Sequence, residues 1–158
     1  MNADNAVRRL FTVKEANQRL PLVRAIVQDI VDLSKDLQQR RERIASVKQL
    51  RGQGTSSSRF HSEETDQVEE EIQRDEERLA EFVRELAELG VEFKDPILGL
   101  VDFPAQMDDR VVQLCWKLGE PEVQFWHELD AGFSGRQLLL AETVSGGPTG
   151  PKEEDPRS

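Results

Sequence analysis

The sequence predicts an α+β protein, in which a long antiparallel helical hairpin, similar to a coiled coil, precedes a small antiparallel β-sheet. Two observations predict this class. Apolar residues recur at alternating spacings of four and three on both sides of a glycine- and serine-rich segment at 52–58. Beyond Gly90 they alternate with polar residues instead. Helices and strands therefore occupy separate parts of the chain, as in α+β folds.

The first helix is expected to begin at Thr12. Thr12 and Glu15 are spaced as a capping box, in which each side chain accepts a hydrogen bond from the backbone amide of the other residue. Pro21 lacks the amide that a helix interior needs. We therefore expect it either to kink this helix or to begin a second one.

The seam between the two helices is expected to contain a polar pair. Its first arm is formed by Ala16, Leu20, Val23, Val27, Ile30, Ser34, Leu37, Arg41 and Ile44. Its second arm is formed by Val68, Ile72, Asp75, Leu79, Phe82, Leu86 and Leu89. Arg41 and Asp75 come close in an antiparallel hairpin, so we expect them to pair and set its register. The alternative is that both side chains reach out to solvent.

The second half of the chain is expected to form short strands. Gly90 and Val91 are placed to end the second helix in a Schellman motif. The expected extended segments, separated by turn residues, are Val91–Phe93, Gly99–Pro104 closed by its proline, Arg110–Leu118 and Glu122–Glu128.

The length of 158 residues fits one domain with a tail. We expect a flexible N-terminus at 1–10, a single α+β domain at 11–140 and a disordered tail at 141–158, because the tail is polar and rich in proline. Within the domain, the helical hairpin takes 11–90, and the small sheet with its loop takes 91–140.

Composition narrows the classes of function. The net charge of −10 argues against general nucleic-acid binding, which needs a basic face. No apolar run is long enough to span a membrane, and the first residues do not resemble a signal peptide. The single cysteine allows no intrachain disulfide, so we expect a cytoplasmic protein.

Residue types that often bind ligands or take part in catalysis are concentrated in the segment Cys115–Arg136. This segment contains the only cysteine, both tryptophans and one of the two histidines. Cys115 and His127 are candidate ligands of a metal such as zinc, although their spacing matches neither CxxC nor HExxH. The strand register that places Cys115 opposite Phe125 and His127 opposite Gln113 makes them diagonal neighbours on one face. A shift by one residue would separate them.

The same residues also suggest thiol chemistry. Cys115, His127 and an orienting Asp130 would fill the roles of a thiolate enzyme. The alternative is that Cys115 is a small core residue and His127 a hydrogen-bonded structural one.

A ligand pocket without covalent chemistry is the third possibility. Trp126 and Phe133 would wall it, and His127, Asp130 and Arg136 would orient an anionic or planar group. The alternative is that the aromatic residues belong to the core of the sheet.

Arg136 follows a Gly-Phe-Ser-Gly loop, where packing gives no reason for an arginine. We expect it to pair with a buried carboxylate, such as that of Asp102 or Asp130.

Five separated motifs occur in order along the chain: Phe11–Asn17, Leu20–Val23, Gly99–Ala105, Leu114–Glu122 and Phe125–Arg136. Together they resemble the bacterial family catalogued as domain of unknown function 2203, over roughly Leu10 to Leu140. Phe125 stands where the family commonly has tyrosine, so no phenolic hydroxyl acts there. The resemblance implies a small cytosolic bacterial protein and brings no activity, cofactor or catalytic residue.

The function predicted from these observations is that of a non-enzymatic cytosolic interaction or ligand-binding protein. The protein would form a homodimer, or bind a partner helix, through the hairpin seam. A small ligand pocket would lie near His127 and Arg136. The alternative is a metal- or thiol-dependent enzyme that uses Cys115 and His127.

Overall fold

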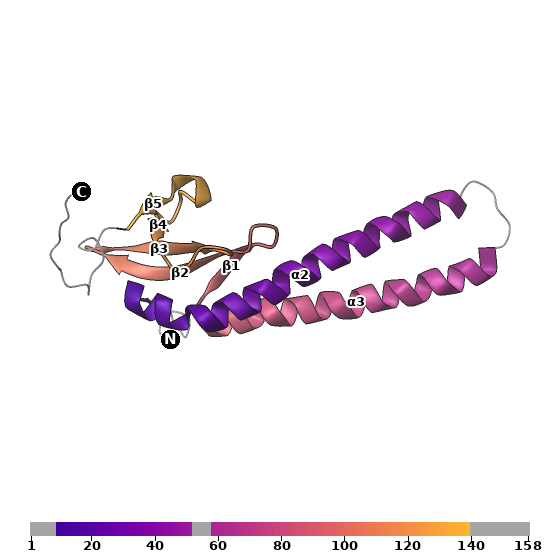
Figure 1. Ribbon diagram of the computed structural model, residues 1–158, viewed down its shortest axis with the longest axis horizontal. Coiled ribbons are helices and arrows are strands. Elements are labelled where there is room, and N and C mark those ends of the chain that lie inside the picture. Colours follow the sequence, from indigo (N-terminus) through magenta and orange to yellow (C-terminus); the bar gives the residue numbers. More distant parts are fainter. Residues whose placement is uncertain (1–8, 52–57, 140–158) are drawn as a thin grey trace, which may run out of the picture.

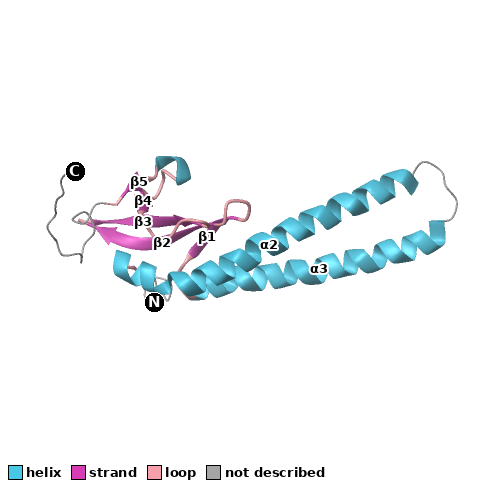
Figure 2. Ribbon diagram, in the orientation of Figure 1, coloured by secondary structure: helices cyan, strands magenta, loops and turns pink. Residues whose placement is uncertain are grey.

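The computed structural model describes residues 9–51 and 58–139, and it confirms the predicted α+β class (Figures 1 and 2). Residues 1–8 of the predicted flexible N-terminus at 1–10 lie outside the described residues, as do the loop at 52–57 and the predicted disordered tail at 141–158. The elements in chain order are helices α2 (Val13–Arg51) and α3 (Ser58–Glu88), strands β1 (Glu92–Asp95), β2 (Leu100–Met107), β3 (Arg110–Lys117) and β4 (Phe125–His127), the short 3₁₀ helix η1 (Phe133–Gly135) and strand β5 (Gln137–Leu138).

The start of α2 is held by the predicted capping box. The Thr12 amide donates to the Glu15 carboxylate at 3.0 Å, and the Glu15 amide donates to the Thr12 hydroxyl at 3.0 Å. Pro21 lies inside α2, so the alternative in which it begins a second helix is wrong. The helix continues because packing of its apolar face outweighs one missing hydrogen bond.

The helical hairpin is held by apolar contacts near the sheet and by ion pairs farther out. The predicted pair between Arg41 and Asp75 is wrong, since Arg40 binds Asp75 at 2.6 Å and Arg41 pairs with Glu76. Neighbouring helix positions point roughly 100° apart, so a one-residue offset selects a different arginine. The hydrogen bond from Arg40 lowers the pKa of Asp75. Lys48 and Glu69 add a further pair.

The predicted Schellman motif ends α3. Gly90 has a φ of 90°, its amide donates to the Ala87 carbonyl at 2.9 Å, and the Val91 amide donates to the Leu86 carbonyl at 2.9 Å. Val91 and Leu86 are both buried, which supplies the apolar contact of this motif. The chain therefore turns directly from the helix into β1.

The five strands form one antiparallel meander in the order β1-β2-β3-β4-β5. The last predicted strand, Glu122–Glu128, is shorter in the structure, where β4 covers only Phe125–His127. The reason lies in α2, because the Val123 amide donates at 2.7 Å to the side chain of Asn17 rather than to a strand. This bond ties the β3–β4 connection to the helix.

The second strand continues through Pro104, so the predicted closure at this residue is wrong. Pro104 lies opposite Gln113 of β3, and its carbonyl accepts a hydrogen bond from the Phe11 amide at 2.7 Å. The nitrogen of Pro104 points to the same side as this carbonyl, toward β1. No residue of β1 pairs with Pro104. Proline is tolerated there because no neighbouring strand needs a hydrogen bond from its nitrogen.

The two faces of the sheet differ. The inner face packs on the helices, and Figure 1 shows α2 and α3 on one side of strands β2 and β3, with η1 on the other. The core residues that the sheet contributes are Val101, Phe103, Ala105, Met107, Val112, Leu114, Trp116 and Trp126. The outer face carries the residues between them, including Asp102, Gln113, Cys115 and His127, all buried.

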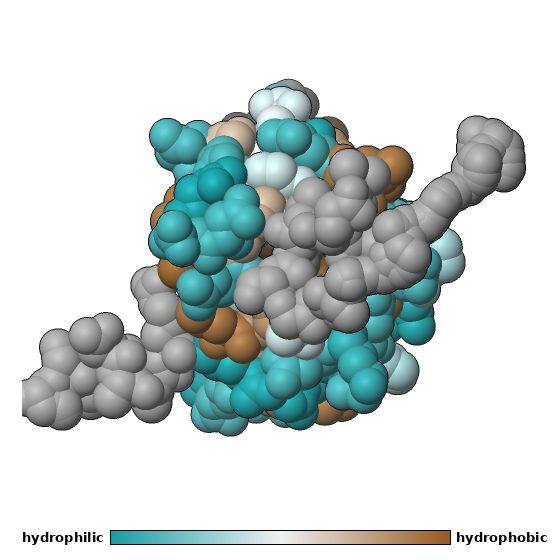
Figure 3. All heavy atoms as spheres, turned by 90° about the vertical axis from the view of Figure 1, so that its left-hand side faces the viewer, coloured by the Kyte–Doolittle hydropathy of each residue, from teal (hydrophilic) through white to brown (hydrophobic). Residues whose placement is uncertain are grey.

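No helix in the part of the chain that the structure describes has the length and apolar character needed to cross a membrane. At the sheet end of the molecule, hydrophobic side chains form separate patches among hydrophilic ones (Figure 3).

Gly99 should not tolerate a side chain. Its φ is 67°, and a Cβ there would lie 2.7 Å from the Cβ of Leu118. We expect Gly99→Ala to lower the free energy of unfolding by about 2–4 kcal/mol, combining backbone strain with overpacking. Urea denaturation measures this. Gly119→Ala is the control, since Gly119 also has a positive φ but a Cβ added there would meet nothing within 4 Å. Equal losses in both variants would exclude the steric contribution.

Candidate metal centre

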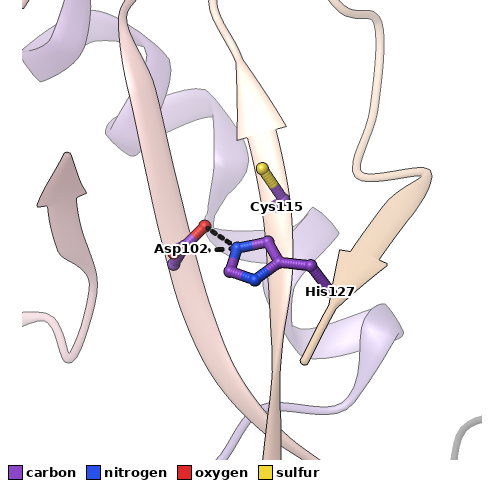
Figure 4. Close-up of side chains that lie close together, drawn as sticks. All are labelled: Asp102, Cys115 and His127. Carbon is purple, nitrogen blue, oxygen red and sulfur yellow. Dashed lines mark hydrogen bonds and ion pairs between the residues drawn. The ribbon is translucent and has the colours of Figure 1, made fainter. Parts of the chain in front are cut away.

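Three potential metal ligands meet on the outer face of the sheet (Figure 4). Asp102 of β2 lies directly opposite Cys115 of β3, and His127 of β4 lies opposite Gln113. Of the two registers that the sequence left open, the structure has the one with Cys115 opposite Phe125. Cys115 and His127 are therefore diagonal neighbours on one face, and Asp102 completes the group.

The three side chains are buried and close together. Asp102, Cys115 and His127 are 2%, 0% and 3% exposed, and their ligand atoms all lie within 4.8 Å of one another. His127 Nε2 lies 3.2 and 3.1 Å from the two carboxylate oxygens of Asp102. His127 Nδ1 lies 2.7 Å from the carbonyl oxygen of Glu128. Both ring nitrogens are thus engaged.

These contacts fix where the protons lie. A carbonyl oxygen only accepts hydrogen bonds, so His127 Nδ1 carries a proton and donates it to Glu128. A second proton lies between Nε2 and the Asp102 carboxyl, either on the imidazole or on the acid. Nε2 therefore faces Asp102 and the Cys115 side, whereas Nδ1 is anchored to the backbone.

Burial governs the acidity of the other two groups. It raises the pKa of Asp102, and the charge and hydrogen bond of His127 oppose this rise. Burial, with a contribution from the Asp102 charge, raises the pKa of the Cys115 thiol to about 12. The thiol therefore stays protonated at neutral pH. A buried thiol of this kind lacks the features of a catalytic nucleophile, which is exposed and has a lowered pKa.

Arg136 lies beside this group but has its own partners. Its guanidinium binds both carboxylate oxygens of Glu120 at 2.7 Å, so the predicted pairing with Asp102 or Asp130 is wrong. It also lies over the rings of Phe125 and Phe133, 4.0 and 4.8 Å from their centroids. Glu120 is in reach because its turn folds back on β3, where its carboxylate also accepts from the Lys117 amide.

The other residues predicted to form a pocket lie in different parts of the structure. Trp126 lies on the inner face and belongs to the core, whereas its neighbour His127 lies on the outer face. Asp130 is exposed, and Phe133 is partly exposed beneath Arg136. The structure thus brings His127 to Cys115, and Arg136 to Phe133. A common pocket for all five residues stays a prediction.

Sequence reasoning missed Asp102 as a partner of Cys115. Two signals point to it: a charged residue within the apolar strand Leu100–Met107, and a tight turn at Asp108–Asp109. This turn pairs Met107 with Arg110, and counting back from it places Asp102 opposite Cys115.

A family model described as "Uncharacterized conserved protein (DUF2203)" matches residues 9–139. The chain belongs to this family. Comparison with curated proteins and with solved structures gives no match. The function of this DUF2203 protein therefore has to be argued from its own residues, and its predicted bacterial origin stays a prediction.

Proposed function

We propose that this protein is a cytoplasmic metal-binding protein, in which Asp102, Cys115 and His127 hold a divalent cation of the zinc class. The observation that carries the proposal is the convergence of three different ligand types, all buried, from three adjacent strands. Asp102 already partners the other two groups, by hydrogen bonds to His127 and to Cys115. A metal ion would replace these contacts with bonds to all three ligands.

The ligand set selects the metal. Thiolate and imidazole ligands suit zinc and cobalt, whereas magnesium and calcium require oxygen ligands. A thiolate, a carboxylate and a neutral imidazole carry two negative charges, which balance a divalent cation in a buried site. The cation would displace the thiol proton and the proton between His127 and Asp102.

The arrangement needs little adjustment to bind. Tetrahedral bonds of about 2.0–2.3 Å place ligand atoms roughly 3.3–3.8 Å apart. The three ligand atoms already lie within 4.8 Å of one another, so rotamer adjustments of about 1 Å would suffice. The bond from His127 Nδ1 to the Glu128 carbonyl is of the kind that orients metal-binding histidines, because it leaves Nε2 for the metal.

Gln113 is the neighbour best placed to support a bound ion. It is the cross-strand partner of His127, it is buried, and its Oε1 atom has no hydrogen-bond partner in the described part of the chain. Its Nε2 atom is held by Glu92 at 3.2 Å. A buried amide oxygen of this kind would accept a hydrogen bond from a metal-bound water. Because the three ligands are buried, we propose binding rather than catalysis.

Untagged protein should bind one cobalt or zinc ion per chain. Cobalt titration is expected to produce the thiolate-to-cobalt charge-transfer band, and zinc is expected to raise the melting temperature. Cys115→Ala should abolish the band, and Asp102→Ala should weaken binding by at least tenfold because one of three ligands is lost.

Asp130→Asn is the matched control, since Asp130 is an exposed acid in the loop that follows β4. It should leave cobalt affinity unchanged. A wild-type protein that shows neither band nor thermal shift would refute the proposal. The three side chains would then form a metal-free network that stabilises the outer face.

Association through the hairpin seam stays a prediction. Several seam residues, among them Ile30 and Leu37, are already buried within one chain.

A further inference from the structure

A groove of about 620 Å³ lies between the helical hairpin and the turn that joins β1 to β2. Its apolar walls are Val31 and Leu37 of α2, Leu79 of α3 and Pro96–Ile97 of the turn. Small-molecule sites typically have volumes of about 300–1,000 Å³. Ile97 is 80% exposed, so one wall presents an apolar side chain to solvent. The groove thus has the size and lining for an apolar body.

Ser34 contributes to the hollow. It occupies a seam position between Ile30 and Leu37, where larger apolar residues are the rule, and it lines the groove. Its hydroxyl oxygen is buried and has no hydrogen-bond partner in the residues that the structure describes. An unsatisfied buried hydroxyl is costly, and helical serines usually bond to a carbonyl of the preceding turn. A polar group of a bound molecule would satisfy it.

The charge of the groove is opposite to that of the chain. The sequence has 31 acidic and 21 basic residues, yet Lys35 and Arg41 line the groove and no acidic residue does. Arg41 is paired with Glu76. Lys35 has no ion pair within the described ranges 9–51 and 58–139, so its charge is available to an anion.

We propose that this groove binds an amphipathic anion, a small molecule with an apolar acyl or aryl body and one carboxylate, sulfonate or phosphate group. The body would pack on Val31, Leu79 and Ile97, and the anionic group would reach Lys35. A second hollow of about 310 Å³ shares Arg41 and is lined farther along the hairpin by Ile44 and Ile72. This site has no residue in common with the metal centre, so neither proposal depends on the other.

Two fluorescent probes test the proposal. Anilinonaphthalenesulfonate has an aromatic body and a sulfonate, and phenylnaphthylamine has the same body without the sulfonate. We expect wild-type protein to bind both at one site per chain. Lys35→Gln should weaken the sulfonate probe about fivefold, as for a partly exposed ion pair, and leave the neutral probe unchanged. Ser34→Leu should weaken binding of both because the larger side chain narrows the groove and the hydroxyl is lost.

Lys14→Gln is the matched control, since Lys14 is an exposed lysine at the far end of α2. It should leave both affinities unchanged. If Ser34→Leu does not fold by circular dichroism, Ile97→Asp on the exposed turn takes its place and should weaken both probes. The proposal fails if wild type binds no probe, or if folded groove variants keep wild-type affinity. It also fails if wild type sediments as a dimer that Ile97→Asp converts to a monomer, because a second copy would then occupy the groove.

Discussion

Replacing His127 with leucine is expected to lower the free energy of unfolding of the metal-free protein by about 3–5 kcal/mol. The change removes one partner of a buried pair and leaves the Asp102 carboxyl without its histidine. Urea denaturation in the presence of a chelator measures this loss. The cost comes from the unpaired acid rather than from lost packing, since leucine occupies a similar volume.

A double variant separates these contributions. Asp102→Val/His127→Leu removes both polar partners, so it should recover most of the stability that His127→Leu loses. Glu128→Gln, which breaks the exposed pair with Arg110 beside the same strand, should leave stability nearly unchanged. Losses in the double variant that equal or exceed the sum of the single variants would contradict a compensated buried pair.

Replacing Arg136 with alanine is expected to lower the free energy of unfolding by about 2–4 kcal/mol. The side chains of Arg136 and Glu120 are 12% and 15% exposed, so the change leaves a largely buried carboxylate without its charged partner and removes the cation over two aromatic rings. Arg136 also donates to the Cys115 carbonyl at 3.5 Å. We therefore expect Cys115 to react faster with a thiol reagent in this variant.

Arg136→Lys is the matched control. It keeps the charge but loses the planar guanidinium that lies over the Phe125 and Phe133 rings, so its stability should fall between those of wild type and Arg136→Ala. If Arg136→Ala unfolds like wild type and Cys115 stays unreactive, this arginine does not hold the loop against β3.

The local features of the fold were predictable because their causes are close together in the sequence. Thr12 and Glu15 are three residues apart, and Gly90 and Val91 follow directly on α3, so capping and the Schellman ending follow from spacing alone. The ion pair of Asp75 was predicted with Arg41, one residue away from its actual partner Arg40. Residues far apart in sequence meet only after two long helices pack, and the hydrophobic pattern fixes their relative placement no more closely than a residue or so.

The candidate site was predictable in part for the same reason. Cys115 and His127 were candidates because a short connection places them on neighbouring strands, but the register that brings them together was left open. Asp102 and Glu120 were not assigned their roles. Asp102 joins through a third strand, and Glu120 binds Arg136 only because its turn folds back over β3.

The sequence by itself determined the α+β class, the capped helical hairpin and the alternation of the strands, since each depends on periodicity or on contacts within a short segment. The structure decided which of the two possible registers Cys115 and His127 take. Only the tertiary structure decided that Asp102 completes the buried cluster, that Glu120 takes Arg136, and that Ser34 and Lys35 line a groove. These arrangements depend on how the sheet and the hairpin pack in three dimensions. A one-dimensional pattern gives the face on which a residue lies, but not the distant side chain that it meets there.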